Sequence, residues 1–569
     1  MNDDSHVLLR AFCDELARCG MTDACTSPGS RCSPLVLALA REPRLRTWSH
    51  VDERCAGFFA LGLAKSCGRP AAVVVTSGTA AAELAPAVHE GREARVPMLV
   101  LTADRPPELR EVGAGQTIDQ IELYGSAAKW FFEVGLHDAT PERLRWMRTL
   151  ACRAYWTALD HRPGVVHLNF PLRDPLVPQG ELPPDQTGRP NGAPFTLRQE
   201  AEALPVPSSL TYLFEAVERR RRGVIVAGRW EHGSALGLAA AGLAETAGYP
   251  VLADPLSGAR MNRATAHYDA LLRDERFAAG HVPELVLRVG DLPTSKPLRA
   301  WLAAARDAEQ VAIAPDGVVQ DPDGVVSLVL PADPAITLAE VNEQVTRAPN
   351  AAWVEAWRRA EDAAAAAVDR SLARPGPSEP LVAAHLGRLL PSDATLVVAS
   401  SMPVRDVETF FPARDEPPRV LSNRGANGID GTVSTAFGVA AASQGPVVLL
   451  IGDVALAHDI GGLLAALRLG LKLTIVLLNN DGGGIFEFLP VAGEADVFEE
   501  HVATPTGLDF ARAAALYECD HMLVEDLGPA LDSALASERT TILEVSTERE
   551  ANVSLHHAVW KAVSEALPR

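Results

Sequence analysis

The sequence has little of what a disulfide-rich, zinc-binding, membrane or nucleic-acid-binding protein needs. Its eight cysteines include no Cys-x-x-Cys pair, so neither a zinc site nor a disulfide framework is indicated. No apolar run approaches the roughly 18 residues of a membrane span. Basic residues are few, 52 against 73 acidic. The net charge of −21 repels nucleic-acid phosphates and anionic lipids unless the basic residues are concentrated in one place.

The N-terminus also lacks the features of a signal peptide. Met1-Asn-Asp-Asp-Ser-His has no basic segment, and charged residues interrupt the apolar stretch that follows. We therefore expect a cytoplasmic protein without a membrane span or a nucleic-acid partner. Six of the cysteines precede residue 70, and we expect them to be small buried apolar side chains.

Two proline-rich segments divide the chain of 569 residues, and each follows a pattern of complete α/β structure. Residues 174–195 contain six prolines. The second segment, Arg374 to Pro380, follows an alanine-rich helical pattern over Ala351 to Leu372. We predict three domains, at residues 1–180, 190–370 and 378–569.

The first and third of these segments show the same order of helix, strand and glycine patterns, which predicts a duplicated domain. Coincidence among glycine- and alanine-rich units is the alternative. The middle segment also alternates strand and helix, but no G-x-G-x-x-G follows its first strand, so a bound dinucleotide is not indicated. The predicted class is α/β, with three doubly wound, Rossmann-like domains built on parallel sheets. The matching features are Gly62, the strand Ala72 to Thr76 and Gly78 in the first segment, and Gly438, the strand Val447 to Ile451 and Gly452 in the third.

The most informative motif lies in the third segment. Gly452-Asp453 directly follows an apolar strand, and Asn480 follows the next apolar strand, Thr474 to Leu478. Polar residues there lie at the carboxyl edge of a parallel sheet, where open α/β folds bind ligands. A carboxylate, an amide oxygen and a carbonyl from the Gly482 region form a set of oxygen ligands that suits Mg²⁺ with phosphate. The alternative is that Asp453 caps a helix and Asn480 lies in a turn.

This arrangement resembles the diphosphate-binding motif of thiamine diphosphate enzymes, although Val454 stands where the usual motif has glycine. The resemblance implies that Asp453, Asn480 and the Gly482 carbonyl hold Mg²⁺, or Mn²⁺, against bound thiamine diphosphate. It also implies that Glu53 hydrogen-bonds the aminopyrimidine ring of the cofactor. Because Glu53 and the metal ligands lie on different domains, the resemblance implies a homodimer or homotetramer with the site shared between subunits.

Further motifs are similar to those of the 2-succinyl-5-enolpyruvyl-6-hydroxy-3-cyclohexene-1-carboxylate synthases of menaquinone biosynthesis. That family implies decarboxylation of 2-oxoglutarate and conjugate, Stetter-like addition of the remaining group to isochorismate. An acetolactate-synthase-like pyruvate carboligase and a catalytically silent binding protein of the same fold are the alternatives. The motifs are Ser27-Pro-Gly-Ser-Arg31, Thr76-Ser-Gly-Thr-Ala80, Leu101 to Leu109 with Gln116, Pro293 to Pro297, Ser400 to Arg405 and Ser422 to Gly431.

The charge of the substrates supports this assignment independently. Both substrates of the family are dicarboxylates, and a chain of net charge −21 must attract them with local cations, for which the planar fork of arginine is well suited. The resemblance implies that Arg405 and Arg424 hold the 2-oxoglutarate-derived group and that Gln116 contacts the reaction intermediate. It places Ser30, Arg31, Arg105 and Lys296 at isochorismate, Ser401 near the diphosphate or the acceptor, Gly452 at the cofactor, and Ile485 and Phe486 beneath it.

Overall fold

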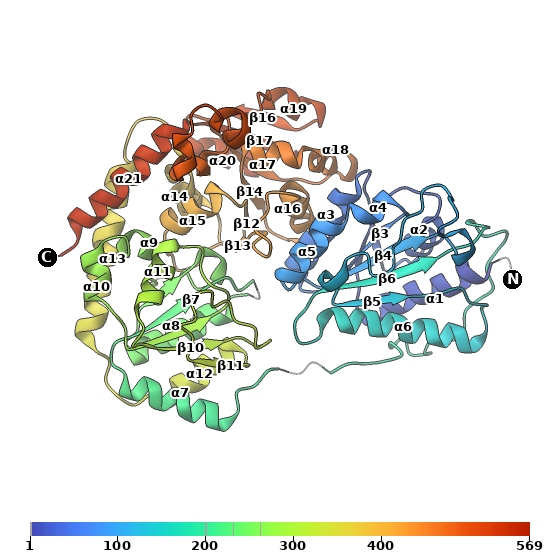
Figure 1. Cartoon of the computed structure of the whole chain (residues 1–569), viewed down its shortest axis with the longest axis horizontal. Coiled ribbons are helices and arrows are strands. Elements are labelled where there is room, and N and C mark those ends of the chain that lie inside the picture. The colour runs from blue at the N-terminus through green and yellow to red at the C-terminus, as the bar shows by residue number, and fades with distance from the viewer. Residues whose placement is uncertain (1–2, 200–201, 232, 262, 569) are drawn as a thin grey trace.

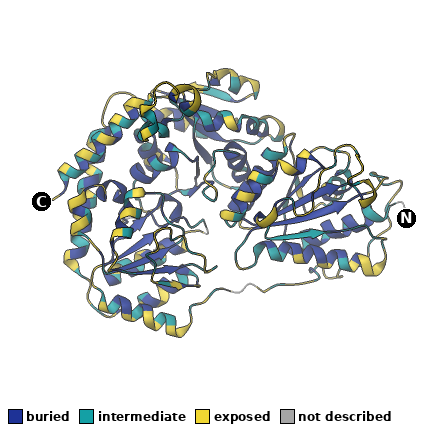
Figure 2. Ribbon diagram, viewed as in Figure 1, coloured by how far each residue is buried: buried dark blue, intermediate teal, exposed yellow. Residues whose placement is uncertain are grey.

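The computed structural model describes residues 3–199, 202–231, 233–261 and 263–568. Three parallel β-sheets, each covered by helices, are arranged along the chain (Figure 1). The predicted α/β class with three parallel-sheet units is confirmed. The buried residues are concentrated in the strands and in the helix faces that pack on them (Figure 2), as expected for parallel sheets covered on both faces.

The first sheet has six strands in the order β2-β1-β3-β4-β6-β5. Helices α1, α2 and α6 pack on one face, and α3 and α5 on the other (Figure 1). The strands are β1 (Asp23–Thr26), β2 (Arg46–Ser49), β3 (Ala71–Val75), β4 (Met98–Asp104), β5 (Trp130–Glu133) and β6 (Val165–Pro171). The helices are α1 (Asp4–Cys19), α2 (Ser33–Ala40), α3 (Glu53–Cys67), α4 (Thr79–Ala82), α5 (Ala85–Glu93) and α6 (Pro141–Leu159).

The third sheet repeats this topology, with six strands in the order β13-β12-β14-β15-β17-β16. Each strand occupies the position of its counterpart in the first sheet, which is what duplication predicts. The strands are β12 (Thr395–Val398), β13 (Arg419–Leu421), β14 (Val447–Gly452), β15 (Thr474–Asn479), β16 (Asp520–Leu523) and β17 (Thr541–Ser546). The helices are α14 (Glu379–Leu389), α15 (Met402–Phe410), α16 (Thr432–Ala442), α17 (Asp453–His458), α18 (Leu464–Leu469), α19 (Phe510–Leu516), α20 (Leu527–Ala536) and α21 (Arg549–Ala566).

The middle sheet has five strands in the order β11-β10-β9-β7-β8. Its last helix, α13, starts at a cap in which the Asn350 side chain accepts the Trp353 N–H, and it covers the predicted range. The strands are β7 (Gly223–Ala227), β8 (Val251–Ala253), β9 (Leu285–Val289), β10 (Glu309–Ile313) and β11 (Leu328–Leu330). The helices are α7 (Pro207–Arg219), α8 (Ala235–Ala247), α9 (Tyr268–Leu271), α10 (Glu275–Gly280), α11 (Lys296–Ala304), α12 (Pro334–Gln344) and α13 (Ala351–Leu372).

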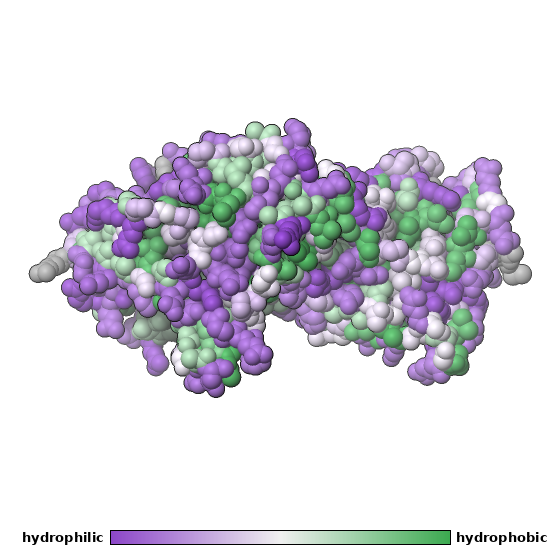
Figure 3. Space-filling view, turned by 90° about the horizontal axis from the view of Figure 1, so that it is seen from above, coloured by the Kyte–Doolittle hydropathy of each residue, from purple (hydrophilic) through white to green (hydrophobic). Residues whose placement is uncertain are grey.

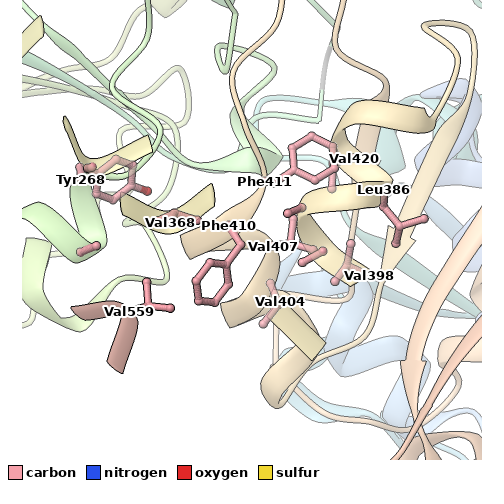
Figure 4. Packing of buried hydrophobic residues seen from close by; sticks show 14 of the residues in the cluster. Tyr268, Val368, Leu386, Val398, Val404, Val407, Phe410, Phe411, Val420 and Val559 are labelled. Carbon is pink, nitrogen blue, oxygen red and sulfur yellow. The ribbon is translucent and has the colours of Figure 1, made fainter. Parts of the chain in front are cut away.

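The middle and third units share one hydrophobic core. Figure 4 shows Phe410 and Val407 of α15 between Tyr268 of the middle unit and Val398 of β12. Val559 of the C-terminal helix α21 belongs to the same cluster. This core holds α15, which carries predicted site residues, against two domains at once.

The first and third units pack directly through α3 and α16, which lie side by side (Figure 1). A Cβ atom on Gly62 would lie 2.1 Å from the Thr435 carbonyl oxygen, and one on Gly438 would lie 2.1 Å from the Phe59 carbonyl oxygen. Only glycine allows backbones to approach this closely. The two glycines that mark the duplicated pattern therefore form the contact between the duplicated domains.

Gly62→Ala is expected to destabilise this contact, because the added methyl group must push the two helix backbones apart. Overpacking of this kind costs about 1–3 kcal/mol, so the denaturant midpoint of unfolding should fall. Gly280→Ala is the matched control, since a Cβ atom at that helical glycine meets nothing within 4 Å. Equal midpoints for the two variants would contradict this account of the contact.

Of the six cysteines before residue 70, which we expected to be buried, Cys67 is the exception. All eight cysteines are free, and seven of them are buried, while Cys67 is partly exposed. Within the described residues, no helix combines the length and the apolar character needed to cross a membrane.

Candidate active site

The carboxyl edge of the third sheet brings Asp453 and the Gly482 loop together. Asp453 is the first residue of α17, directly after β14, and is 2 % exposed. Its Oδ2 accepts the Gly482 N–H at 2.7 Å. Burial raises the pKa of Asp453 to about 6, although backbone N–H groups partly oppose the shift. Burial makes the ionised form of this carboxyl group costly, and a cation bound beside it would stabilise that form.

Asn480 lies at the same edge, one residue after β15. Its Nδ2 donates to Glu379 Oε1 at 2.7 Å, whereas its Oδ1 is buried and has no hydrogen-bond partner. The Gly482 carbonyl accepts the Gly484 N–H at 3.0 Å and keeps a second lone pair. An unpartnered buried amide oxygen is rare, and a cation is one partner that satisfies it.

These oxygen donors fit a hard divalent cation that keeps positions for phosphate oxygens and water. In the described ranges, no three Asp, Glu, His or Cys side chains gather into a metal site. A metal here would therefore rely on one carboxylate, one amide and one backbone carbonyl. Gly482 has φ of +139°, and a Cβ atom there would lie 2.8 Å from the Ala503 carbonyl oxygen, so the loop requires glycine.

Two arginines lie at the same edge without a carboxylate partner. Arg405 Nη1 donates to the Ser401 carbonyl oxygen, and Arg424 Nη1 donates to Ser400 Oγ at 3.5 Å. Neither forms an ion pair with another described residue. Burial lowers the pKa of both arginines, and the charge of Arg405 lowers that of Arg424 further. Two neighbouring guanidinium groups that are partly desolvated favour an anionic ligand.

The carboxyl edge of the first sheet carries a second arginine pair. Arg105 donates to Ser77 Oγ at 2.8 Å and to the Gly115 carbonyl oxygen at 3.0 Å. Burial lowers the pKa of Arg31, and the charge of Arg105 lowers it further. Arg31 Nη1 forms a long ion pair with the exposed Asp174, at 3.8 Å from its Oδ2. Gln116 joins this group, since its Nε2 donates to the Ser77 carbonyl oxygen at 3.0 Å.

Three cations at another cavity are paired with acidic residues, unlike most of the arginines in the two pairs at the sheet edges. A cavity of about 550 Å³ lies where the three units meet. There Lys65 pairs with Glu231 at 3.0 Å, Arg95 pairs with Asp291 at 2.7 Å, and Arg229 pairs with the same aspartate. These three cations are therefore already matched by acids of the chain.

Glu53 is the first residue of α3, whose start is capped by Asp52. Burial raises the pKa of Glu53, and neighbouring Asp52 and Glu83 raise it further. The residue after Glu53 contacts the C-terminal end of α17, whereas Asp453 lies at the N-terminal end of that helix. In this contact, Arg54 Nη2 donates to the His458 carbonyl oxygen at 3.0 Å. Within the described part of the chain, no hydrogen bond or ion pair joins Glu53 to Asp453, Asn480 or Gly482.

The remaining predicted residues are placed as follows. Ser30 is exposed in the loop before α2, and Lys296 is exposed at the start of α11. Lys296 forms no hydrogen bond or ion pair with another described residue. Ser401 adopts φ of 71° just before α15, a conformation uncommon outside glycine. Gly452 ends β14, and Ile485 and Phe486 lie on a 3₁₀ turn beside the Gly482 loop.

Two polar residues that were not predicted as site residues touch predicted ones. Ser77 links Arg105 and Gln116, and it lies inside a motif already noted. Glu379 contacts Asn480 but is separated from it by about 100 positions in the chain. A glutamate at the first position of a helix is common because it interacts favourably with the helix dipole, so no sequence signal identifies Glu379.

Each of the three units matches a known family of protein domains. The N-terminal TPP (thiamine pyrophosphate) binding domain of thiamine pyrophosphate enzymes matches residues 7–123, and the middle domain of thiamine pyrophosphate enzymes matches residues 197–398. The C-terminal TPP binding domain matches residues 403–545. The fold and the site thus define a thiamine diphosphate enzyme.

Similarity to curated proteins identifies the family within this class of enzymes. Three of these relatives are named 2-succinyl-5-enolpyruvyl-6-hydroxy-3-cyclohexene-1-carboxylate synthase. The relative from Geobacillus kaustophilus is 43% identical over 100% of both chains. The relative from Chloroflexus aurantiacus is 43% identical over 100% of this chain and 98% of its own. The relative from Listeria monocytogenes is 41% identical over 98% of this chain and 97% of its own. The chain belongs to this synthase family, which confirms the resemblance and does not support the acetolactate-synthase-like alternative.

Proposed function

We propose that the protein decarboxylates 2-oxoglutarate and transfers the remaining four-carbon group to isochorismate. The product is 2-succinyl-5-enolpyruvyl-6-hydroxy-3-cyclohexene-1-carboxylate, formed with release of CO₂ in menaquinone biosynthesis. The observation that carries this proposal is the two arginine pairs, Arg31 with Arg105 and Arg405 with Arg424. They lie at the carboxyl edges of the two duplicated sheets, and among the described residues their one ion pair joins Arg31 to Asp174, in a chain of net charge −21. Both proposed substrates carry two carboxylates.

Asp453, Asn480 and the Gly482 carbonyl are the residues we assign to Mg²⁺, which would bind the diphosphate of the cofactor. When bound, thiamine diphosphate supplies an electron sink for the pair left by decarboxylation. Gly452 contributes its backbone next to this centre, and Ile485 and Phe486 provide apolar contact for the cofactor. Mn²⁺ suits the same oxygen donors.

The other polar residues position the reactants. Arg405 and Arg424 bind the free carboxylate of the 2-oxoglutarate-derived group by charge-assisted hydrogen bonds. Glu53 exchanges a proton with the cofactor ring through a hydrogen bond, for which a raised pKa is suited. The residues assigned to isochorismate are Ser30, Arg31, Arg105 and Lys296, with Gln116 at the reacting group and Ser401 near the diphosphate or the acceptor.

We further propose that the active unit is a homodimer or a homotetramer with each site shared between two chains. Contacts within one chain place the start of α3 by the far end of α17, away from Asp453, so a second chain can supply Glu53. The edge strand β16 and the helix α19 offer a surface for association, because Leu516 and Leu523 are 72% and 64% exposed. Figure 3 views this side of the molecule, where hydrophobic patches interrupt the hydrophilic surface. The domains remain assigned to residues 1–180, 190–370 and 378–569.

The decisive experiment measures CO₂ release from carboxyl-labelled 2-oxoglutarate in the presence of thiamine diphosphate and Mg²⁺. Isochorismate is included in one arm and omitted from the other. We expect release that depends strongly on isochorismate. No release in either arm, with cofactor binding verified, would contradict the proposal, and preferential release from labelled pyruvate would favour a pyruvate carboligase.

A further inference from the structure

Glu379 is a buried carboxyl group that neither the fold nor the proposed chemistry so far requires. It begins α14 and is 1% exposed. The cap of that helix is Ser378, whose side chain accepts the Leu381 N–H, so Glu379 is not needed for capping. In the described residues, no Lys, Arg or His lies within ion-pair distance of Glu379. Burial of a carboxyl group is costly unless hydrogen bonds or an ion pair compensate for the lost water.

The hydrogen bonds of Glu379 lead to the metal-site loop. Its Oε1 accepts from Asn480 Nδ2 at 2.7 Å and from the Thr547 hydroxyl at 3.1 Å. Thr547 is itself fixed, because its N–H donates to the Asn479 carbonyl oxygen at 2.9 Å. Glu379, Thr547 and the 479–480 segment therefore close a ring of hydrogen bonds behind the loop.

This ring decides which end of the Asn480 amide points at Glu379. The oxygen and the NH₂ group of an amide are nearly identical in shape, and hydrogen bonding selects between the two orientations. Glu379 Oε1 acts as the acceptor, so it selects the NH₂ group and leaves Asn480 Oδ1 on the other side. That Oδ1 is the buried atom without a partner. The flipped amide would present an NH₂ group in its place, which cannot coordinate a cation.

The packing around the amide leaves room for its contact with Glu379. A Cβ atom on Gly484 would lie 2.8 Å from Asn480 Nδ2, so this glycine leaves the space that the NH₂ group occupies next to Glu379. We propose that Glu379 is a positioning residue that holds Asn480 with its Oδ1 facing the metal site it shares with Asp453. The inference rests on the proposed function, because it takes Asn480 as a metal ligand.

The neighbouring asparagine provides a matched control. Asn479 Nδ2 donates to Glu544 Oε1 at 2.6 Å, so a glutamate orients this amide in the same way. Asn479 is not proposed as a metal ligand. Loss of Glu544 therefore removes an equivalent hydrogen bond next to the loop without affecting the proposed ligand.

The test is Mn²⁺ binding to the full-length protein in the presence of thiamine diphosphate, followed by electron paramagnetic resonance. We expect Glu379→Leu to raise the Mn²⁺ dissociation constant by about 10- to 100-fold, as loss of an outer-shell partner does in other metal sites. Glu379→Gln keeps an acceptor oxygen and should bind close to the unsubstituted protein, as should Glu544→Leu. At saturating metal and cofactor, kcat of Glu379→Leu should recover while the KM for the metal stays high.

The controls separate failure of this inference from failure of the proposed metal site. Asn480→Ala should lose Mn²⁺ binding, and if it does not, the metal site itself is misassigned and this inference goes with it. If Asn480→Ala loses binding while folded Glu379→Leu binds normally, the positioning role is overturned, as it is if Glu379→Gln is as weak as Glu379→Leu. Should Glu379→Leu fail to fold, Glu379→Ala, which admits water into the vacated space, replaces it with the same expected loss.

Discussion

Glu53→Gln is expected to lower kcat by about 10³-fold, within the range for loss of a general acid or base, and to leave the fold and cofactor binding intact. Glutamine has the same shape but cannot give or take the proton that the proposed role requires. The side chain lies at the first position of α3, where burial raises the pKa of its carboxyl group. Steady-state turnover of 2-oxoglutarate with isochorismate measures the effect, and calorimetric titration of thiamine diphosphate checks binding.

The matched control for this substitution is Glu83→Gln. Glu83 is an exposed carboxylate close enough to raise the pKa of Glu53, but it has no proposed role, so turnover should be retained. Mixed oligomers of Glu53→Gln and Asp453→Ala chains test the shared site, because one of the two sites in such a dimer keeps both groups. Activity in Glu53→Gln near that of the unsubstituted protein would contradict the catalytic role, and inactive mixed oligomers would contradict the sharing.

Arg405→Met and Arg424→Met are each expected to raise the KM for 2-oxoglutarate by about 10- to 100-fold. Hydrogen bonds to charged groups contribute about 1.5–3 kcal/mol, and each 1.4 kcal/mol corresponds to about tenfold in affinity. The two guanidinium groups lie close enough for Arg405 to lower the pKa of Arg424, so a dicarboxylate bound between them relieves their repulsion. Steady-state kinetics with varied 2-oxoglutarate measures the change.

The specificity of these variants separates substrate binding from a general defect. A 2-oxo acid without the second carboxylate does not use the proposed contact, so the preference of the enzyme for 2-oxoglutarate over 2-oxobutyrate should fall with the loss of either arginine. Arg359→Met on α13, where the side chain is 60% exposed, should change neither value. An unchanged KM in Arg405→Met and Arg424→Met would assign the dicarboxylate to other residues.

Much of the fold follows from local sequence patterns. The strands β14 and β15 are runs of Val, Leu and Ile between polar segments, and parallel strands buried on both faces have this composition. Each strand is one residue longer at its C-terminal end than predicted: β14 ends at Gly452, not Ile451, and β15 ends at Asn479, not Leu478. The helix α13 has the predicted bounds, because a capping asparagine precedes it and its alanine-rich pattern is uninterrupted.

The candidate site was predictable where a functional side chain follows a strand directly. Asp453 and Asn480 directly follow neighbouring parallel strands, whose carboxyl ends must meet at one edge. The position of Glu53 relative to these residues was not predictable in the same way. It depends on how α3 packs on α16 and, in the shared site that we propose, on a second chain, and no local pattern reports either contact.

The sequence by itself determined the class of fold, the duplicated order of elements and the residue types at the sheet edges, because each depends on the hydrophobicity and spacing of neighbouring residues. Only the tertiary structure decided that Gly62 and Gly438 lie against the facing helix, that Arg405 and Arg424 lie together without an ion pair to any other described residue, and that Glu379 contacts Asn480. The physical reason is that these contacts join segments far apart in the chain. Their energies depend on desolvation, close approach and hydrogen bonds that exist only after the domains have packed.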